Sequence, residues 1–213
     1  MTKKIKIDIV SDVVCPWCTI GYKRLAKAIS ELGMEDQVEI EWHPFELNPN
    51  MPSEGQNVNE HLAEKYGSTL EQQKASKQQM TLVGKELGFI FDYFDDMRMV
   101  NTLDAHVLLE YAKEFGKQTE LNMRLTTAFF SERKDVSNRD VLKQALLDVG
   151  LNAEEGLAKL DNDEARYEVK TKEGYWQNLG VSSVPTVVFN GKSAVTGAQP
   201  VELFKEVLTE LME

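Results

Sequence analysis

The chain has 213 residues, 42% of them hydrophobic and 28% charged, the composition of an ordinary folded protein with one large domain or a domain carrying an insertion. Its formal net charge of −11 argues against a nucleic-acid partner. No apolar run is long enough to cross a membrane, and the first residues, MTKKIKIDIV, lack the apolar stretch of a signal peptide. We therefore expect a cytoplasmic protein, in which closely spaced cysteines serve catalysis or metal binding rather than structure.

The first fifty residues predict a β-α-β unit. Residues 5–9 alternate isoleucine with polar side chains, which is the period of a strand. Residues 20–32 place apolar side chains three and four apart, as on one face of a helix, and Gly33 is suited to end it. Residues 38–42 alternate again. The connection is long enough for a right-handed crossover, so we expect parallel strands.

Helical periodicity dominates the middle of the chain. It recurs at residues 58–66, 70–87, 102–115, 119–131, 139–149 and 153–178. The end of the chain predicts a β-β-α unit. Pro185 opens a strand, Asn190 and Gly191 form a hairpin turn, and an amphipathic helix follows Pro200. The sequence thus predicts an α/β fold with a large all-helical domain, residues 51–164, inserted between a βαβ unit (1–50) and a ββα unit (165–213).

The segment VVCPWCTIG contains the only two cysteines of the sequence, Cys15 and Cys18. At a strand-to-helix junction, Cys15 would lie at a helix N-terminus, where free backbone N–H groups and the helix dipole favour a thiolate. Cys18 follows one turn later on the same face, within reach of a disulfide bridge. Pro16 suits the first helical position, and Trp17 would form an apolar wall beside the sulfur. The pair is therefore a candidate for thiol–disulfide exchange, with Cys15 attacking and Cys18 resolving.

Other uses of the two cysteines fit the sequence less well. A structural zinc would need further ligands from His43, His61 or His106, and these histidines have no paired spacing. Haem attachment requires a histidine directly after the second cysteine, where this chain has Thr19. Two packed, inert cysteines remain an alternative. We expect no metal site.

Pro185 is the second candidate feature. In the simpler interpretation it is only a strand-start proline, at a position where no N–H is needed for pairing. In the sharper interpretation the Val184–Pro185 bond is cis and faces the cysteines, so that the backbone of Val184 can pair with an extended substrate.

Several polar residues are weaker candidates. Asn101, Asp104 and His106 would shape the substrate cleft from the helical insertion, although His106 also fits an ordinary position on the flank of a helix. His43 would stabilise the thiolate if it approaches Cys15. Asp12 either caps the helix or turn, or raises the thiol pKa or takes a proton during exchange.

Four motifs together, SDVVCPWCTIG, WHPFELNP, NTLDAHVLLEYA and GVSSVPTVVFNGKSAVTGAQP, resemble the DsbA-related thioredoxin-fold oxidoreductases of the FrnE type. The resemblance covers essentially the whole chain. It implies a thioredoxin-like fold interrupted by the helical domain, a redox-active Cys15–Cys18 pair and a cis-proline at Pro185. Some FrnE-type proteins carry a second cysteine pair near the C-terminus, which this chain lacks.

The resemblance extends to the 2-hydroxychromene-2-carboxylate isomerases and kappa-class glutathione transferases. These relatives typically carry serine where this chain has Cys15, so two cysteines favour dithiol chemistry. The sequence therefore predicts a thiol–disulfide oxidoreductase. Its expected partner is a disulfide-containing protein or a glutathione-type thiol, with no cofactor beyond glutathione as a redox partner. A glutathione-dependent isomerase or transferase and a non-catalytic binding module are the alternatives. The predicted site residues are Cys15, Cys18 and Pro185 for catalysis and Pro16, Trp17, Val184, His106 and Asn101 for substrate binding.

Overall fold

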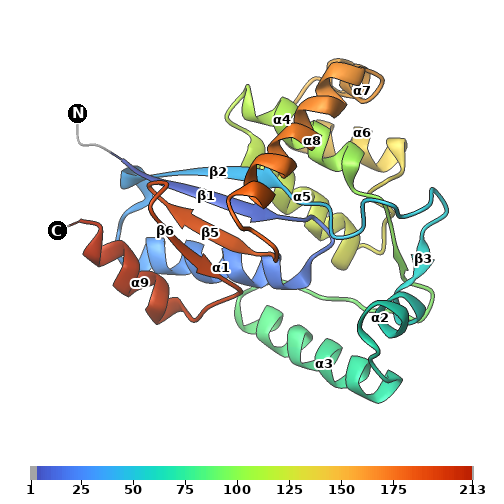
Figure 1. The fold of residues 1–213 in the computed structure, drawn as a ribbon, viewed down its shortest axis with the longest axis horizontal. Coiled ribbons are helices and arrows are strands. Elements are labelled where there is room, and N and C mark those ends of the chain that lie inside the picture. Colours follow the sequence, from blue (N-terminus) through green and yellow to red (C-terminus); the bar gives the residue numbers. More distant parts are fainter. Residues whose placement is uncertain (1–3, 213) are drawn as a thin grey trace.

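A four-stranded sheet forms the centre of the computed structural model, which describes residues 4–212 (Figure 1). Its strands are β1 (Ile5–Ser11), β2 (Val38–Pro44), β5 (Thr186–Phe189) and β6 (Ser193–Thr196). The strand order is β2-β1-β5-β6, with β1 and β2 parallel and the other neighbours antiparallel. Strand β1 has a neighbouring strand on each side, and helices cover both faces of the sheet. Five consecutive residues of β1, 7–11, are therefore buried.

Helices cover both faces of this sheet (Figure 1). Helix α1 (Pro16–Glu31) connects β1 to β2, followed by a short 3₁₀ turn (Glu35–Gln37), and packs beside the last helix, α9 (Val201–Glu210). Helix α8 (Asp163–Asn178) contacts β2. One apolar cluster joins the sheet to α1 and α9, because their inward positions are uniformly apolar. It includes Ile7, Ile9, Leu25, Ile29, Trp42, Phe189, Phe204 and Leu208.

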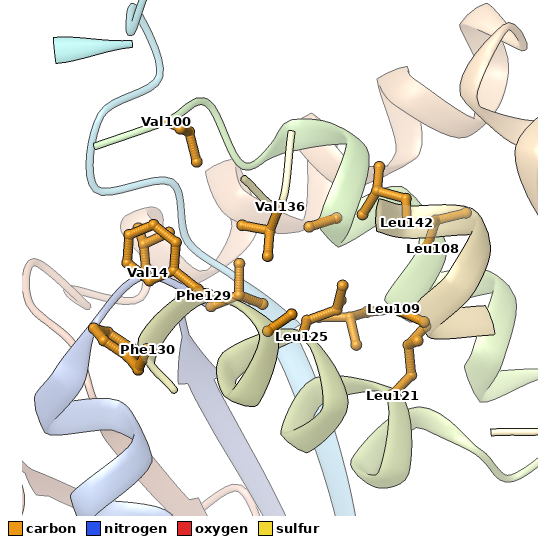
Figure 2. Packing of buried hydrophobic residues seen from close by; sticks show 14 of the residues in the cluster. Val14, Val100, Leu108, Leu109, Leu121, Leu125, Phe129, Phe130, Val136 and Leu142 are labelled. Carbon is orange, nitrogen blue, oxygen red and sulfur yellow. The ribbon is translucent and has the colours of Figure 1, made fainter. Parts of the chain in front are cut away.

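The segment between β2 and α8 is mainly helical. It contains α2 (Val58–Tyr66), α3 (Leu70–Glu86), α4 (Leu103–Lys113), α5 (Gln118–Phe130), α6 (Arg139–Asp148) and α7 (Ala153–Leu160). Figure 2 shows that apolar side chains along α5, from Leu121 to Phe130, point into a second apolar cluster. Val13, Val14 and Ile20 belong to the same cluster, so the residues on either side of the two cysteines pack against the helical segment.

Gln118 at the start of α5 forms hydrogen bonds between the helical segment and strand β2 of the sheet. Its Nε2 donates to the carbonyl oxygen of Trp42, and its Oε1 accepts from the N–H of Trp42, both at 2.9 Å. The indole Nε1 of Trp42 donates to Thr119 Oγ1, also at 2.9 Å. β2 is an edge strand, so these side-chain bonds satisfy backbone groups that no further strand pairs with.

The predicted β-α-β and β-β-α units and the parallel pairing of the first two strands are confirmed. The prediction of an all-helical insertion was wrong in one detail. A two-stranded ribbon joins β3 (Gln56–Asn57) to β4 (Arg98–Met99), strands too short to show an alternating pattern. The single helix predicted at 153–178 is two helices, because Asn162 caps a new N-terminus through the N–H groups of Glu164 and Ala165.

The predicted domain boundary at 164/165 falls in the first turn of α8 and stays a prediction. Within the described residues 4–212, the longest and most apolar helices fall short of what a membrane crossing requires.

Candidate active site

Cys15 lies at the junction between β1 and α1, where the chain leaves the strand and starts the helix. It is the N-cap residue, with φ −93° and ψ 111°, and Pro16 occupies the first turn without the loss of a hydrogen bond. The Sγ atom of Cys15 accepts the N–H of Cys18 at 3.3 Å. A negative charge on this sulfur therefore meets a backbone donor and the positive end of the helix dipole.

Cys18 differs from Cys15 in its surroundings. Both side chains are buried, and the structure records both as free thiols. Burial raises the pKa of the Cys18 thiol well above its usual range, and the neighbouring sulfur of Cys15 raises it further. The Cys18 thiol is therefore protonated at neutral pH.

Pro185 approaches the cysteines from β5. The Val184–Pro185 peptide bond is cis, and the carbonyl oxygen of Val184 lies 4.0 Å from Cys15 Sγ. The proline ring packs against α1 at Gly21, where a Cβ would lie 3.1 Å from Pro185 Cγ. Sequence reasoning did not single out Gly21; its smallness matters only once the distant Pro185 lies beside it.

A cavity of about 370 Å³ opens beside Cys15. Cys15, Pro16, Trp17 and Val184 line one side, and Trp17 is 38% exposed at the surface. The rest of the lining comes mainly from the helical segment and includes Val58, Met80, Met97, Met99, Phe129 and Phe130, with His61, Gln73 and Lys77 as polar members. Two larger hollows, of about 820 and 780 Å³, contain neither cysteine.

Asp12, three residues before Cys15, is the polar residue that acts on the Cys18 thiol. The Asp12 backbone forms a hydrogen bond with the Cys18 thiol, which lowers the pKa of Cys18, while the negative charge of the Asp12 carboxylate raises it. Asp12 Oδ2 accepts the N–H of Leu47 at 2.8 Å. The other oxygen, Oδ1, lies 3.4 Å from His106 Nε2, an ion-pair distance that lacks hydrogen-bond alignment.

His106 lies on α4 and is 2% exposed. Burial lowers its pKa, but the carboxylates of Asp12, Glu173 and Glu46 outweigh burial, and the net pKa of His106 is raised. Glu46 follows β2, and its N–H donates to Glu173 Oε1 at 2.6 Å. Sequence reasoning missed both glutamates, because residues 46 and 173 are far apart in the chain and both look like surface residues.

Lys170 completes this group from α8. Its Nζ contacts Glu46 and lies 3.3 Å from Glu173 Oε2, while its side chain is 42% exposed. The net pKa of Glu46 is raised. Burial and the nearby charge of Glu173 both raise it, and together they outweigh the ammonium group of Lys170, which lowers it. We call Asp12, His106, Glu46, Glu173 and Lys170 the inner cluster.

The model of the DSBA-like thioredoxin domain matches residues 6–209. The chain belongs to this family. A probable DsbA oxidoreductase from Streptomyces coelicolor superposes with a TM-score of 0.91 at 32% identity, covering 98% of this chain and 90% of that one. The Bacillus subtilis protein YwbO is 27% identical over 210 residues, which are 97% of this chain and 96% of YwbO. The chain is thus a DsbA-like oxidoreductase with a Cys-x-x-Cys pair.

More distant solved structures share the fold. A 2-hydroxychromene-2-carboxylate isomerase superposes with a TM-score of 0.73 at 14% identity, covering 97% of this chain and 96% of that one. The cytosolic disulfide reductase DsbM from Pseudomonas aeruginosa, solved with GSH, superposes at 0.70 and 17% identity, covering 98% and 100%. At these identities the likeness concerns the fold alone.

In this DsbA-like chain, some predicted site residues lie together and others do not. Pro16, Trp17 and Val184 line the Cys15 cavity, whereas His106 lies in the inner cluster and outside the cavity lining. Asn101 is also outside it, because its Oδ1 accepts the N–H of Leu103 at the start of α4 and its Nδ2 contacts Pro49 O. A role of His106 and Asn101 in substrate binding stays a prediction.

Two further polar candidates also lie elsewhere. Asp104 pairs with Arg166. His43 forms a 2.8 Å hydrogen bond with Asp8, away from the Cys15–Cys18 pair. With Glu41, these two residues bring three possible metal-ligand atoms within 4.8 Å of one another in the described chain. The ammonium group of Lys6 lies within ion-pair distance of both carboxylates, Asp8 and Glu41, and compensates part of their negative charge.

Proposed function

We propose that this protein is a thiol–disulfide oxidoreductase of the FrnE type, in which Cys15 attacks a substrate disulfide and Cys18 resolves the mixed disulfide. The observation that carries the proposal is the environment of Cys15 Sγ. It accepts a backbone N–H at a helix N-terminus, borders an open cavity and lies 4.0 Å from the Val184 carbonyl. These conditions favour a nucleophilic sulfur that a substrate can reach.

The reaction has two exchange steps. The Cys15 thiolate attacks one sulfur of a disulfide R–S–S–R, the S–S bond breaks, and one R–S⁻ leaves while Cys15 holds the other. Cys18 then loses its proton and attacks Cys15 Sγ. This second attack releases the other R–S⁻ and forms the Cys15–Cys18 disulfide. The protein gives up two electrons and the substrate accepts them; the oxidised protein runs the same steps in reverse.

The substrate class in this proposal is a disulfide-containing protein or a glutathione-type disulfide. The Val184 carbonyl beside Cys15 supports it, because a backbone acceptor next to the reactive sulfur can hold an extended substrate. Pro16 and Trp17 border the same opening and would contact the groups on either side of the disulfide.

Cysteine-to-serine variants test the proposal. With insulin or glutathione disulfide as substrate, Cys15→Ser should reduce turnover to background, because a neutral hydroxyl does not replace the thiolate. Cys18→Ser should accumulate a mixed disulfide at Cys15, detected as added mass by mass spectrometry. Full turnover in both variants would overturn the assignment.

A glutathione-dependent isomerase or transferase is the second candidate. The apolar cavity beside Cys15 favours it, because 370 Å³ falls within the volume range of small-molecule sites. This function predicts glutathione binding that survives the loss of Cys18. Calorimetry on Cys18→Ser measures it, and the absence of binding heat would exclude this candidate.

A further inference from the structure

The cavity beside Cys15 offers few charges to a substrate. Among the residues that the structure describes, its lining contains one charged side chain, Lys77, and neither an arginine nor a carboxylate. Lys77 Nζ already donates to Asn59 Oδ1 at 2.5 Å and lies 5.7 Å from the centre of the Tyr93 ring. Glutathione carries two carboxylates and one ammonium group on each arm of its disulfide, so most of these charges would lose water in the cavity without gaining a partner.

His61 on α2 is a polar member of this lining, and a chain of hydrogen bonds determines which of its ring nitrogens carries the proton. The chain begins at the Glu64 carboxylate, which only accepts, so Gln56 Nε2 donates to Glu64 Oε2 at 2.7 Å. The other end of the Gln56 amide, Oε1, then accepts from His61 Nδ1 at 2.8 Å. The neutral imidazole therefore carries its proton on Nδ1, and Nε2 has a free lone pair.

The free nitrogen of His61 is available to a molecule in the cavity. Nε2 has no hydrogen-bond partner among residues 4–212, and the side chain is 9% exposed. Gln56 is not part of the cavity lining, so Nδ1 points out of the cavity and the opposite edge of the ring is left for an occupant. Burial and the positive charge of Lys65 lower the pKa of His61, against the opposing charge of Glu64, so the imidazole is neutral at pH 7.

Gln73 on α3 adds a second acceptor with a fixed orientation to the same lining. Its Nε2 donates to the carbonyl oxygens of Asn59 and Ser68, at 3.0 and 3.2 Å, and a carbonyl oxygen can only accept. The amide oxygen Oε1 therefore points away from these partners, and it is buried without a hydrogen-bond partner in the described part of the chain. Unsatisfied buried acceptors are uncommon in folded proteins, and two free acceptors in a largely apolar lining favour an occupant that donates.

We propose that this cavity binds one arm of the substrate disulfide and selects a neutral, apolar arm with a hydroxyl or N–H donor, with His61 Nε2 as the acceptor that determines the specificity. The inference rests on the proposed oxidoreductase function and narrows its substrate class. A volume of about 370 Å³ accommodates an aromatic arm next to the sulfur that Cys15 attacks. The arm belongs either to a small thiol compound or to the side chain beside a cysteine of a polypeptide. His61 positions the arm and exchanges no bond in the reaction.

Two matched pairs of disulfides test this specificity. In the first pair, bis(4-hydroxyphenyl) disulfide has a donor that bis(4-methoxyphenyl) disulfide lacks. In the second pair, the disulfide dimers of N-acetyl-cysteinyl-tyrosine amide and N-acetyl-cysteinyl-phenylalanine amide differ by the same hydroxyl group. Glutathione disulfide provides the charged arm for comparison.

The second-order rate constant for oxidation of the reduced protein is measured with each disulfide at pH 7, by acid quenching, alkylation and mass spectrometry. Each value is divided by the rate constant of the same disulfide with dithiothreitol, which removes differences in intrinsic reactivity. His61→Phe replaces the imidazole with a ring that has no acceptor, and Gln56→Met removes the partner that fixes the tautomer. His43→Phe is the matched control, because His43 is also 9% exposed but bonds to Asp8 and lies outside the cavity lining.

In the wild-type protein we expect the hydroxylated member of at least one pair to react about fivefold faster than its partner, the size expected for one buried hydrogen bond. This ratio should fall to about one in His61→Phe, take an intermediate value in Gln56→Met and keep its wild-type value in His43→Phe. The corrected rate with glutathione disulfide should be about 10-fold lower than with the preferred hydroxylated disulfide. A preference confined to the aryl pair would identify a small-molecule arm, and one confined to the dipeptides a polypeptide arm.

Equal corrected rates within both pairs in the wild-type protein would overturn the inference. A preference that His61→Phe retains would overturn it too, because another residue would then provide the acceptor; a merely structural role of His61 would slow both members of a pair equally and leave their ratio unchanged. A corrected rate with glutathione disulfide above those of the hydroxylated disulfides would contradict the selection of a neutral arm. Failure of every disulfide to oxidise the wild-type cysteines would instead refute the proposed function itself.

Discussion

Two buried aspartates precede the cysteines, Asp8 in strand β1 and Asp12 in the turn after it, and each faces a histidine from another part of the chain. Asp8 accepts a 2.8 Å hydrogen bond from His43, with Lys6 at 3.1 Å. Asp12 lies 3.4 Å from His106 without hydrogen-bond alignment. We call Asp8, His43, Glu41 and Lys6 the outer cluster, to be compared with the inner cluster around Asp12.

The two clusters use the same residue types for different purposes. In the outer cluster the imidazole and the carboxylate satisfy each other, and Lys6 balances the charge close to solvent. In the inner cluster, one oxygen each of Asp12 and Glu46 and one imidazole nitrogen of His106 have no hydrogen-bond partner within the described residues. A satisfied pair stabilises a fold, whereas an unsatisfied buried group calls for another explanation, such as a catalytic role. Position relative to the cysteines, not composition, distinguishes them.

The largest difference between the clusters should appear when each aspartate is removed. Asp12→Ala leaves the N–H of Leu47 without its acceptor and removes the carboxylate within ion-pair distance of His106, and we expect the free energy of unfolding to fall by about 3 kcal/mol. Asp8→Ala should lower it by about 1 kcal/mol, because Lys6 keeps Glu41 as a partner. Urea denaturation measures both values, and equal losses would remove the distinction between the clusters.

The clusters should also respond to opposite ends of the pH range. The folded-state pKa of His106 is raised, since its three carboxylate neighbours outweigh burial, so its stabilising contribution is complete below the ordinary value of 6.5 and disappears as pH rises through the raised value. The pKa of Asp8 is lowered: burial acts to raise it, but His43 and Lys6 outweigh burial. Its contribution is complete above the ordinary value of 3.8 and disappears as pH falls through the lowered value.

Unfolding free energies of His106→Gln and Asp8→Asn, each measured against wild type, test these two windows. The deficit of His106→Gln should shrink between pH 6 and pH 9, while that of Asp8→Asn should shrink between pH 5 and pH 2. If either deficit stayed constant over its window, the corresponding ion pair would not contribute to stability.

The sequence predicted the frame of the site because that frame is local. The isoleucines of β1, the helix periodicity after Ile20 and the Cys15–Cys18 spacing each lie within a short window, where a strand period or a helix N-terminus can be recognised. The hairpin at Asn190 was equally visible. These signals were enough for the fold class and for the junction that carries Cys15.

The surroundings of the cysteines depend on contacts across the chain and were not predicted. Glu46 and Glu173 are 127 residues apart, and although Glu46 lies in the WHPFELNP motif, nothing in the sequence indicates that the two side chains meet. His106 was expected to shape the substrate cleft, and its contact with Asp12 at 3.4 Å was not predicted. Gly21 matters only through Pro185. Buried charge clusters and cavities depend on how distant segments pack, and one sequence contains no periodic signal for that packing.

The smallest effects should come from the lysine at the solvent edge of each cluster. Lys6→Met removes a half-exposed ammonium group from Asp8 and Glu41, and we expect a loss of about 1 kcal/mol or less in unfolding free energy. Lys170→Met should have an effect of similar size on stability, because the Lys170 side chain is 42% exposed and solvent screens its charge.

The two lysine variants should nevertheless differ in their effect on the nearby histidine. Removing the positive charge of Lys170 leaves Glu46 and Glu173 to act on His106 with less compensation, which raises the pKa of the imidazole further. The pKa of His106, followed by the NMR signals of its imidazole across a pH titration, should therefore move upward in Lys170→Met and stay unchanged in Lys6→Met. A shift in the opposite direction would mean that Lys170 does not act on His106 through these two glutamates.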